Sequence, residues 1–393
     1  MERFDLVIVG AGVAGASLAR LAASRGKRVL VLEALAAPGG CLQSHRLPDG
    51  FWFELGAHTC YNSYSTLLDL AGPPASLPLL PRQKAPWRLL VEGRVASIFG
   101  QLSVLEALGS AWRLFTSSKE GKTVQEYYSG LVGPKNYDRV FGPLFAAVPS
   151  QRADEFPASM LFKKRPRRKD APRSFTVEGG LQTLVERLLD HPAVTLRTEV
   201  EVSRVCPDGV GIAVQTTAGE ELTAPGAALA VPPSVAARLS AADFPEVQRP
   251  LAAIRTVQVE ALGIVVRKDA VKLPLAAGFI PVDGSFYSVV TRDPVDHPTL
   301  RAFTVHFKPE TPVAQRLGQA IELLGLPGPE AVLAKVEHQV LLPSPTRDHA
   351  RRVQELDQAL AGLPLLVTGN YFGGLAIEDC VRRSQVEVER LPR

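Results

Sequence analysis

Cysteine is scarce in this chain, which has four among its 393 residues: Cys41, Cys60, Cys206 and Cys380. No two of them stand at a C-x-x-C spacing, so the sequence supplies neither a zinc-ligand set nor a disulfide framework. We therefore expect free thiols, no metal site and a reduced, cytoplasmic protein.

Long apolar runs and a strong charge of one sign are also missing. No uninterrupted apolar run approaches the about 18 residues that a membrane-spanning helix needs. Glu2 and Asp5 stand where an export signal carries basic residues, so the apolar N-terminus is interpreted as a buried strand. The net charge of +4 argues against a general nucleic-acid role. Peripheral contact with the inner face of a membrane stays open.

A glycine-rich turn is the most informative feature that is present. GAGVAG, residues 10–15, stands between an apolar run and a predicted helix. In such a turn Gly10 allows a tight bend, Gly12 leaves room for phosphates and Gly15 lets the helix pack on the strand. The alternative is a nucleotide-free sheet in which these glycines serve only for packing.

An acidic residue completes the pattern. Glu33 ends a second apolar run, from Val29 to Leu32, and stands 21 residues after Gly12. A carboxylate at this place accepts hydrogen bonds from both hydroxyls of an adenosine ribose and repels a ribose phosphate. The pattern therefore predicts a dinucleotide site and argues against NADP.

The rest of the chain alternates between helical and extended patterns. From residue 64 to about 145 the spacing is mostly helical, with helices predicted over 102–115 and 124–131. A helix at 181–189 and strands at 194–205, 211–217 and 227–231 resume the nucleotide-binding unit. Residues 250–310 alternate apolar and polar side chains, as in a second sheet. Helices are predicted at 312–324 and at 376 to about 390.

Four separated segments resemble the FAD-dependent amine oxidase superfamily, and most closely the protoporphyrinogen oxidases within it. They are GAGVAG with VLEA and PGG, then FELGAH, then FTVEGGLQTLVERL, and finally LLVTGNYFGGLAIEDC. The resemblance implies an α/β fold, with a Rossmann-like FAD-binding domain, a second, sheet-based substrate domain and an inserted helical region. We expect residues 1–70, 175–240 and 345–393 to bind FAD, and the insertion 71–174 and the sheet 241–344 to form the substrate domain.

The resemblance also implies which residues hold the cofactor. The second glycine pair lies at the flavin end, Val200 meets the adenine through its backbone, and the last helix directs its N-terminus at the flavin. A helix N-terminus offers partial positive charge and free N–H groups, which suit the negative charge of a reduced flavin. The implied cofactor residues are Gly10, Ala11, Gly12, Val13, Ala14, Gly15, Glu33, Ala34, Gly39, Gly40, Gly56, Ala57, His58, Val200, Gly369, Leu375, Ala376 and Ile377.

Three side chains are candidates for the substrate pocket, and no catalytic residue is named. His58 could orient substrate or shuttle a proton, or could simply bond to backbone beside the cofactor. Tyr371 and Phe372 could form an aromatic wall over the flavin, or could pack a strand end. Cys380 falls on the apolar face of the last helix, and Asn370 stands where a covalently linked oxidase has cysteine, so we expect noncovalent FAD.

A basic loop, KKRPRRK at residues 163–169, leaves its role open. It could grip substrate carboxylates, meet anionic lipid or be solvated. Asp379 could stabilise the first turn of the last helix or bind cofactor.

The resulting hypothesis is an FAD-dependent oxidoreductase that takes hydride from a largely apolar small-molecule substrate. Dioxygen or another acceptor would then reoxidise the reduced flavin. A protoporphyrinogen or coproporphyrinogen oxidase leads, followed by an amine oxidase and then a carotenoid or squalene desaturase. From different classes, an isomerase like UDP-galactopyranose mutase and a non-catalytic flavoprotein remain alternatives.

Overall fold

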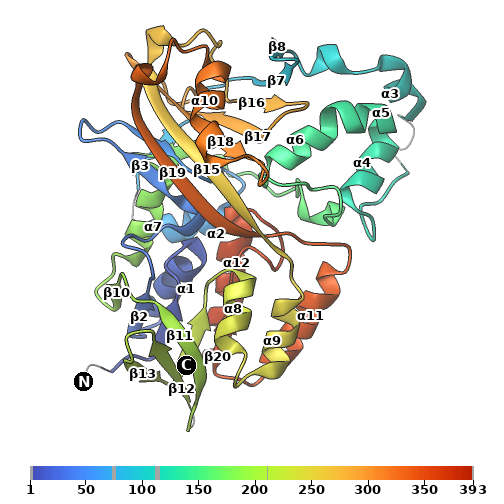
Figure 1. Cartoon of the computed structure of the whole chain (residues 1–393). Helices are drawn as coiled ribbons and strands as arrows, with labels where there is room; N and C mark the ends of the chain where they lie inside the picture. Colours follow the sequence, from blue (N-terminus) through green and yellow to red (C-terminus); the bar gives the residue numbers. More distant parts are fainter. Residues whose placement is uncertain (1–2, 73–76, 111–115, 210, 392–393) are drawn as a thin grey trace.

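The computed structural model describes residues 3–72, 77–110, 116–209 and 211–391. It confirms the predicted α/β fold, in which a parallel sheet lies at one end of the molecule and a larger, mostly antiparallel sheet at the other (Figure 1). Both chain ends lie near the parallel sheet.

The parallel sheet is the layer that the apolar runs around the glycine turn predict. Its strand order is β10-β2-β1-β14-β20. β1 is entirely buried, because a parallel sheet carries helices on both faces and its central strands are apolar on both sides. The strand bounds are β1 Leu6–Val9, β2 Val29–Leu32, β10 Val194–Arg197, β14 Gly226–Leu229 and β20 Leu365–Val367.

Helices cover both faces of this sheet. One face packs against the first group, which are α1 Val13–Ala23, α2 Ser65–Ala71, α7 Leu181–Leu189 and α12 Ile377–Val388. The other face packs against α8 Pro233–Ser240, α9 Pro245–Ala252 and α11 His349–Leu360. The predicted helices over 181–189 and near the C-terminus are thus present.

The predicted strand over 194–205 is divided in two at Glu199, where φ is +59°. The N–H groups of Glu199 and Val200 donate to Leu35 O and Glu33 O, at 3.1 and 2.9 Å. The chain then leaves the parallel sheet for a three-stranded meander. Its strands are β11 Val202–Asp208, β12 Gly211–Thr216 and β13 Glu221–Ala224.

The second sheet has seven strands in the order β19-β15-β18-β17-β16-β7-β8. One face packs on α10 Val313–Leu324, while Phe53 and Leu55 lie against the other face at Gly263. The strands are β7 Trp87–Val91, β8 Arg94–Ala96, β15 Thr256–Arg267, β16 Gly278–Pro281, β17 Phe286–Thr291, β18 Leu300–Phe307 and β19 Val332–Pro343.

Two small sheets connect these layers. β3 Ser44–Arg46 pairs with β4 Trp52–Glu54, and β9 Ser174–Val177 pairs with β5 Cys60–Tyr61 and β6 Leu79–Pro81. Residues 79–96, predicted within a mostly helical stretch, therefore form strands, and two of these extend the seven-stranded sheet. Sequence periodicity could not assign these strands, because a short strand is defined by its partner and β7 pairs with β16, almost 200 residues away.

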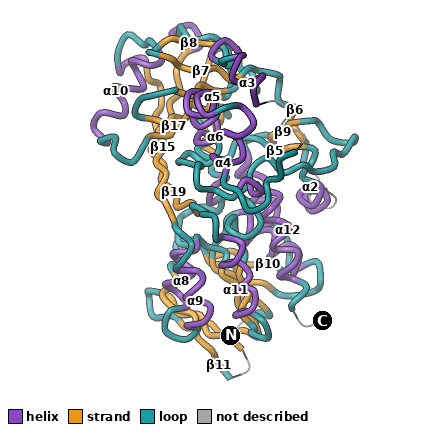
Figure 2. The backbone as a smooth tube through the Cα atoms, turned by 90° about the vertical axis from the view of Figure 1, so that its right-hand side faces the viewer, coloured by secondary structure: helices purple, strands orange, loops and turns teal. Residues whose placement is uncertain are grey.

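The described helices of the insertion lie to the right of the large sheet in Figure 1, and they face the viewer in Figure 2, which is turned by 90°. They are α3 Val104–Ser110, α4 Val124–Val132, α5 Pro134–Asn136 and α6 Gly142–Ala147, with a π-helical turn at Tyr137–Phe141 before α6. The predicted helix over 102–115 is seen as α3, and its end at 111–115 lies outside the described residues. Short 3-10 turns lie at Gly40–Leu42, Phe99–Gln101, Ala158–Met160, Lys268–Ala270 and Pro329–Ala331.

Within the described part of the chain, no helix has the length and apolarity needed to span a membrane.

Candidate functional site

The glycine turn joins β1 to α1 with the geometry that its sequence predicts. Gly10 has φ of +101°, and a Cβ there would lie 2.6 Å from Ala230 O. A Cβ on Gly15 would clash with the Gly10 carbonyl oxygen. Glycine is thus required at both positions by backbone contacts alone.

The second glycine pair forms the opposite side of the turn. Gly39 and Gly40 have φ of +146° and +56°, and Gly39 pairs with Gly12 in an isolated parallel bridge. A methyl group on Gly12 would meet only the Gly40 Cα, at 3.8 Å, and Gly39 O. The two glycine segments therefore come together as one backbone cradle at the start of α1, although the paired Gly12 and Gly39 are 27 residues apart in the sequence.

The cradle has the chemistry of an anion site. α1 begins at Gly12 without a side-chain cap, and its first turn contains no acidic residue. A helix N-terminus of this kind presents backbone N–H groups and partial positive charge to an approaching phosphate. The residues present therefore fit the diphosphate of a dinucleotide.

Glu33 lies beside the cradle at the end of β2. Its two carboxylate oxygens accept hydrogen bonds from Ala11 N at 2.8 Å and Leu35 N at 3.0 Å. Ala34 is exposed next to it, and the Val200 N–H donates to the Glu33 carbonyl oxygen. Three predicted adenosine-side residues are thus gathered at neighbouring strand ends, although the Val200 N–H already has a protein acceptor.

The GAH segment follows β4 and packs on the second glycine pair. Ala57 N donates to Cys41 O at 2.9 Å, and a Cβ on Gly56 would lie 2.5 Å from the same oxygen. His58 Nδ1 lies 3.4 Å from Gly56 O. Burial, together with the neighbouring Arg82 and His306, lowers the pKa of His58 to about 3, so its ring is neutral at ordinary pH.

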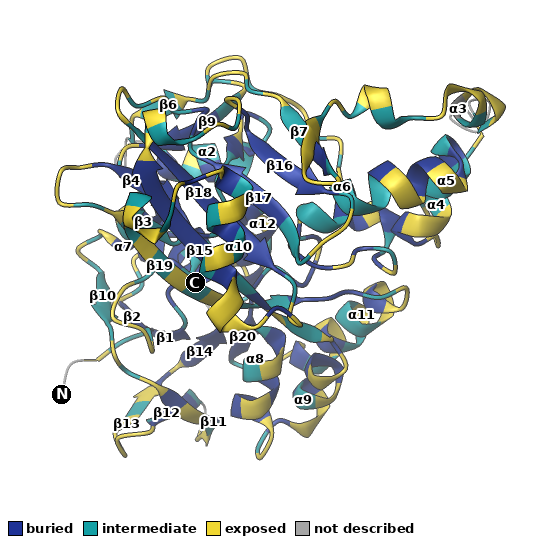
Figure 3. Cartoon of the chain, turned by 45° about the horizontal axis from the view of Figure 1, so that its top comes forward, coloured by how far each residue is buried: buried dark blue, intermediate teal, exposed yellow. Residues whose placement is uncertain are grey.

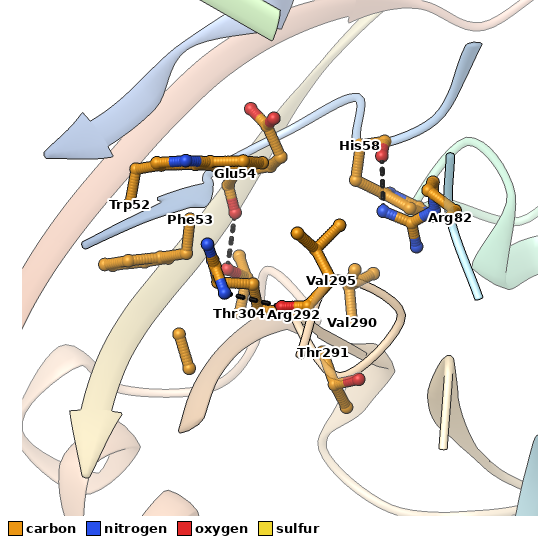
Figure 4. Close-up of a pocket in the computed structure, with 11 residues that line it drawn as sticks. Trp52, Phe53, Glu54, His58, Arg82, Val290, Thr291, Arg292, Val295 and Thr304 are labelled. Carbon is orange, nitrogen blue, oxygen red and sulfur yellow. Dashed lines mark hydrogen bonds between the residues drawn. The ribbon is translucent and has the colours of Figure 1, made fainter. Parts of the chain in front are cut away.

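A small cavity opens beside His58, between β4 and the strands β17 and β18 (Figure 4). Its volume is about 10 Å³, close to the minimum for one ordered water. Trp52, Phe53 and Val290 contribute apolar walls, and Arg82 and Arg292 contribute guanidinium groups.

The two arginines carry charge that is only partly compensated. Arg82 Nη1 donates to His58 O at 2.8 Å, and Arg292 Nη1 donates to Val295 O at 2.5 Å. No carboxylate of the described residues comes within 4 Å of either guanidinium. Arg292 also lies 4.6 Å from the ring centroids of Phe51 and Trp52. Burial lowers the pKa of both groups, which is the direction expected when a cation loses water.

Glu54 also lines this cavity, and its carboxylate is hydrogen-bonded to Ser44 and Leu181. It accepts from Ser44 Oγ at 2.6 Å and from Leu181 N at 2.8 Å, while its backbone oxygen accepts from Thr304 Oγ1. Burial raises the pKa of Glu54 to about 7 against the opposing effect of these hydrogen bonds.

The tail brings its predicted cofactor residues to the N-terminus of α12. Gly369 follows β20, and Ala376 is the N-cap residue, with Ile377 beginning the helix. Leu375 packs on the helical insertion, while Ala376 packs on the core of the parallel sheet. This helix N-terminus therefore lies where the layer of the parallel sheet meets the insertion.

Tyr371 and Phe372 lie in the core on the α8, α9 and α11 side of the parallel sheet. Their rings stack with centroids 4.9 Å apart, and the Arg383 guanidinium lies 3.6 Å from the Phe372 centroid. Neither residue lines the described cavity. Of the three predicted pocket residues, only His58 is brought to it.

Sequence reasoning assigned no role to Glu54, Arg82 or His306. Glu54 stands inside the FELGAH segment, which was the only signal for it. Arg82 falls in a proline-rich loop, and His306 in an alternating strand where Ser288 Oγ lies 3.1 Å from its Nδ1. Glu54 belongs to the same segment as His58, and only the packing of separate segments brings Arg82 and His306 near this histidine.

The fold and the cradle define a protein with a Rossmann-like dinucleotide-binding domain. Residues 8–71 match the family model described as NAD(P)-binding Rossmann-like domain. A stretch of 67 residues matches the 15-cis-phytoene desaturase of Arabidopsis thaliana with 39% identity. That match covers 17% of this chain and 12% of the desaturase, so the chain matches only a small part of that relative.

Solved structures resemble this chain over almost its whole length. A structure titled putative protoporphyrinogen oxidase, from Exiguobacterium sp. 255-15, has a TM-score of 0.76 at 18% identity, covering 99% of this chain and 98% of the other. Cyclohexylamine oxidase from Brevibacterium oxydans IH-35A has a TM-score of 0.71 at 17% identity, covering 99% of each chain. Over almost its whole length the chain therefore has the same fold as these two structures.

Proposed function

We propose that this protein is an FAD-dependent oxidoreductase acting on a largely apolar small molecule. The observation that carries the proposal is the double-glycine cradle, with an uncapped α1 on one side and Glu33 on the other. FAD is proposed to bind noncovalently, with its diphosphate at Gly12 and Gly39. Glu33 and Ala34 would face the adenosine ribose.

When bound, FAD supplies a hydride acceptor. The chain supplies position, exclusion of water and fixed charge. His58 is neutral and half-buried, so it can donate or accept a hydrogen bond without adding charge beside the cofactor. The N-terminus of α12, from Leu375 to Ile377, is proposed to face the flavin.

The cavity favours one substrate class over the others. A guanidinium group binds carboxylates well and repels an ammonium group. Arg82 and Arg292 therefore disfavour a polyamine, and a hydrocarbon such as an isoprenoid has no use for them. An apolar ring system with carboxylate arms, as in protoporphyrinogen or coproporphyrinogen, suits the mixture of Trp52, Phe53 and two arginines. We propose that Arg82 and Arg292 face one carboxylate arm of the substrate through the single water that this cavity can hold.

The insertion supports peripheral contact with a membrane. In α3 the carboxylate of Glu106 turns inward and accepts from Lys135 N and Asn136 N, at 3.0 and 2.8 Å. Leu105 and Leu108 are 85% and 68% exposed on this helix, at the far tip of the molecule (Figure 3). An apolar surface presented in this way is typical of an interaction site. Sedimentation of the protein with anionic vesicles, compared with a Leu105→Asp variant, tests the proposal.

The test of function has two stages. Purified protein is titrated with FAD, and the flavin absorption and fluorescence report binding. The loaded protein is then mixed without oxygen with a porphyrinogen, a polyamine panel and an isoprenoid, while flavin bleaching is followed. Bleaching by the porphyrinogen supports the leading proposal, and bleaching by a polyamine would replace it with an amine oxidase.

Two alternatives make different predictions in the same experiment. An isomerase would need prereduced flavin and would be bleached by no substrate. A non-catalytic flavoprotein would take up FAD fully and respond to nothing. Failure to bind FAD at all would end the proposal.

A further inference from the structure

The basic loop reaches across to the first turn of α12. Lys163 Nζ donates to Gly373 O and lies 3.5 Å from Asp379 Oδ1. Arg165 Nη2 donates to the same carboxylate oxygen at 2.7 Å. These contacts join residues more than 200 positions apart, so part of this loop is fixed in the structure.

The carboxylate at the centre of this group is buried. The side chain of Asp379 is 7% exposed, and that of Arg165 is 12% exposed. Asp379 Oδ2 also accepts from the Ala376 N–H at 3.3 Å. A Cβ on Gly374 would clash with Asp379 Oδ2 and would lie 3.4 Å from Lys163 Nζ. The glycine therefore lets the backbone close over the charged group.

The Asp379 carboxylate opposes the role that the proposed function gives to the N-terminus of α12, which is to face the flavin. A helix N-terminus favours a negative ligand, and an acidic side chain in the same turn cancels that effect. The first turn of α12 also contains Glu378, whose carboxylate is paired with Arg382 at 2.8 Å. With that pair neutral, two cations on Asp379 leave a net charge of +1 at the N-terminus of α12. The arrangement keeps Asp379 as a cap for the helix while restoring a positive potential in front of it.

We propose that Lys163 and Arg165 set the reduction potential of the bound flavin by overcompensating Asp379. Lys163 acts as a positioning residue, because it touches the Gly373 backbone and Asp379 rather than a reacting atom. The inference rests on the proposed function, since it needs FAD in the cradle with its flavin toward Leu375–Ile377. Positive charge beside the pyrimidine edge of the flavin stabilises the reduced form, because the reduced flavin carries negative charge there.

The adjacent lysine provides a matched control. Lys164 is exposed, whereas Lys163 is directed at α12. Lys163→Met and Lys164→Met remove the same charge from neighbouring positions. The reduction potential of each FAD-loaded variant is measured against reference dyes, and the dissociation constants of oxidised and reduced FAD are measured separately.

The expected result is a more negative potential for Lys163→Met and no change for Lys164→Met. Reduced FAD should lose affinity more than oxidised FAD. A tenfold difference between the two losses corresponds to about 30 mV for a two-electron couple. Lys163→Arg should restore the potential, and so should Lys163→Met combined with Asp379→Asn, because both return the local charge to +1.

Equal potentials for the two Met variants would overturn the inference, as would equal weakening of oxidised and reduced FAD in Lys163→Met. The second outcome would mean that Lys163 only holds the loop in place. Failure of the wild-type protein to bind FAD is a separate result, which ends the proposed function itself.

Discussion

Replacement of Gly12 by alanine gives the sharpest test of the cradle. Gly12 has φ of −74° and ψ of −179°, an extended conformation that alanine adopts freely. The added methyl would lie 3.8 Å from Gly40 Cα, an ordinary contact, so the fold has room for it. Alanine is a poorer helix N-cap than glycine, and the loss of stability should stay near 1 kcal/mol or below.

The effect on the cofactor should be much larger. The methyl would stand between the two glycine segments, where the diphosphate is proposed to lie. Loss of two hydrogen bonds from backbone N–H groups to a charged phosphate costs about 3 to 6 kcal/mol. At 1.4 kcal/mol per factor of ten, FAD affinity should fall by roughly 10² to 10⁴.

Isothermal titration with FAD, paired with thermal unfolding, measures both effects. Gly318→Ala is the control, because Gly318 lies in α10 with open space around its Cβ position. It should leave FAD binding unchanged. A folded Gly12→Ala variant that binds FAD as tightly as the wild type would refute the cradle. Gly15→Ala should instead lose stability, because its methyl clashes with the Gly10 carbonyl oxygen.

Two further predictions concern carboxylates. Glu33→Ala should weaken FAD binding by about 10²-fold, since charge-assisted hydrogen bonds contribute about 1.5 to 3 kcal/mol each; unchanged affinity in a titration would contradict the adenosine assignment. Burial raises the pKa of Glu54 to about 7, above its ordinary value, so the fold is favoured when this carboxyl is protonated. The free energy of unfolding of the wild type, compared with Glu54→Gln, should therefore fall as the pH rises from about 4.5 through 7, by up to about 3 kcal/mol. Urea unfolding of both proteins at pH 5 and pH 8 measures this, and parallel pH profiles would show that Glu54 is not buried as described.

The nucleotide-binding part of the site was predictable because its constraints are local. The tight turn, the close approach of backbone and the start of the helix all constrain residues within one short segment. The sequence therefore shows them directly as Gly10, Gly12 and Gly15. The acidic residue at the end of the next strand follows at a fixed distance in the chain. These features need no knowledge of what packs against them.

The pocket side was predicted less well, and Tyr371 shows why. Its position beside two glycines suggested an aromatic wall, and the structure places it in the core behind the parallel sheet. The same alternation of aromatic and small residues describes a strand end in either place. Which side of the sheet receives the ring depends on α8 and α9, which are distant in the sequence from the tail, as well as on the neighbouring α11.

The sequence by itself determined the class of fold, the cradle and the acidic residue beside it, because each depends on backbone geometry within a few residues. Only the tertiary structure decided how charges are paired. It placed Lys163 and Arg165 on Asp379, left Arg82 and Arg292 in one cavity, and shifted the pKa of Glu54 by burial. Desolvation and ion pairing depend on groups that meet through folding, and no local pattern records which groups will meet.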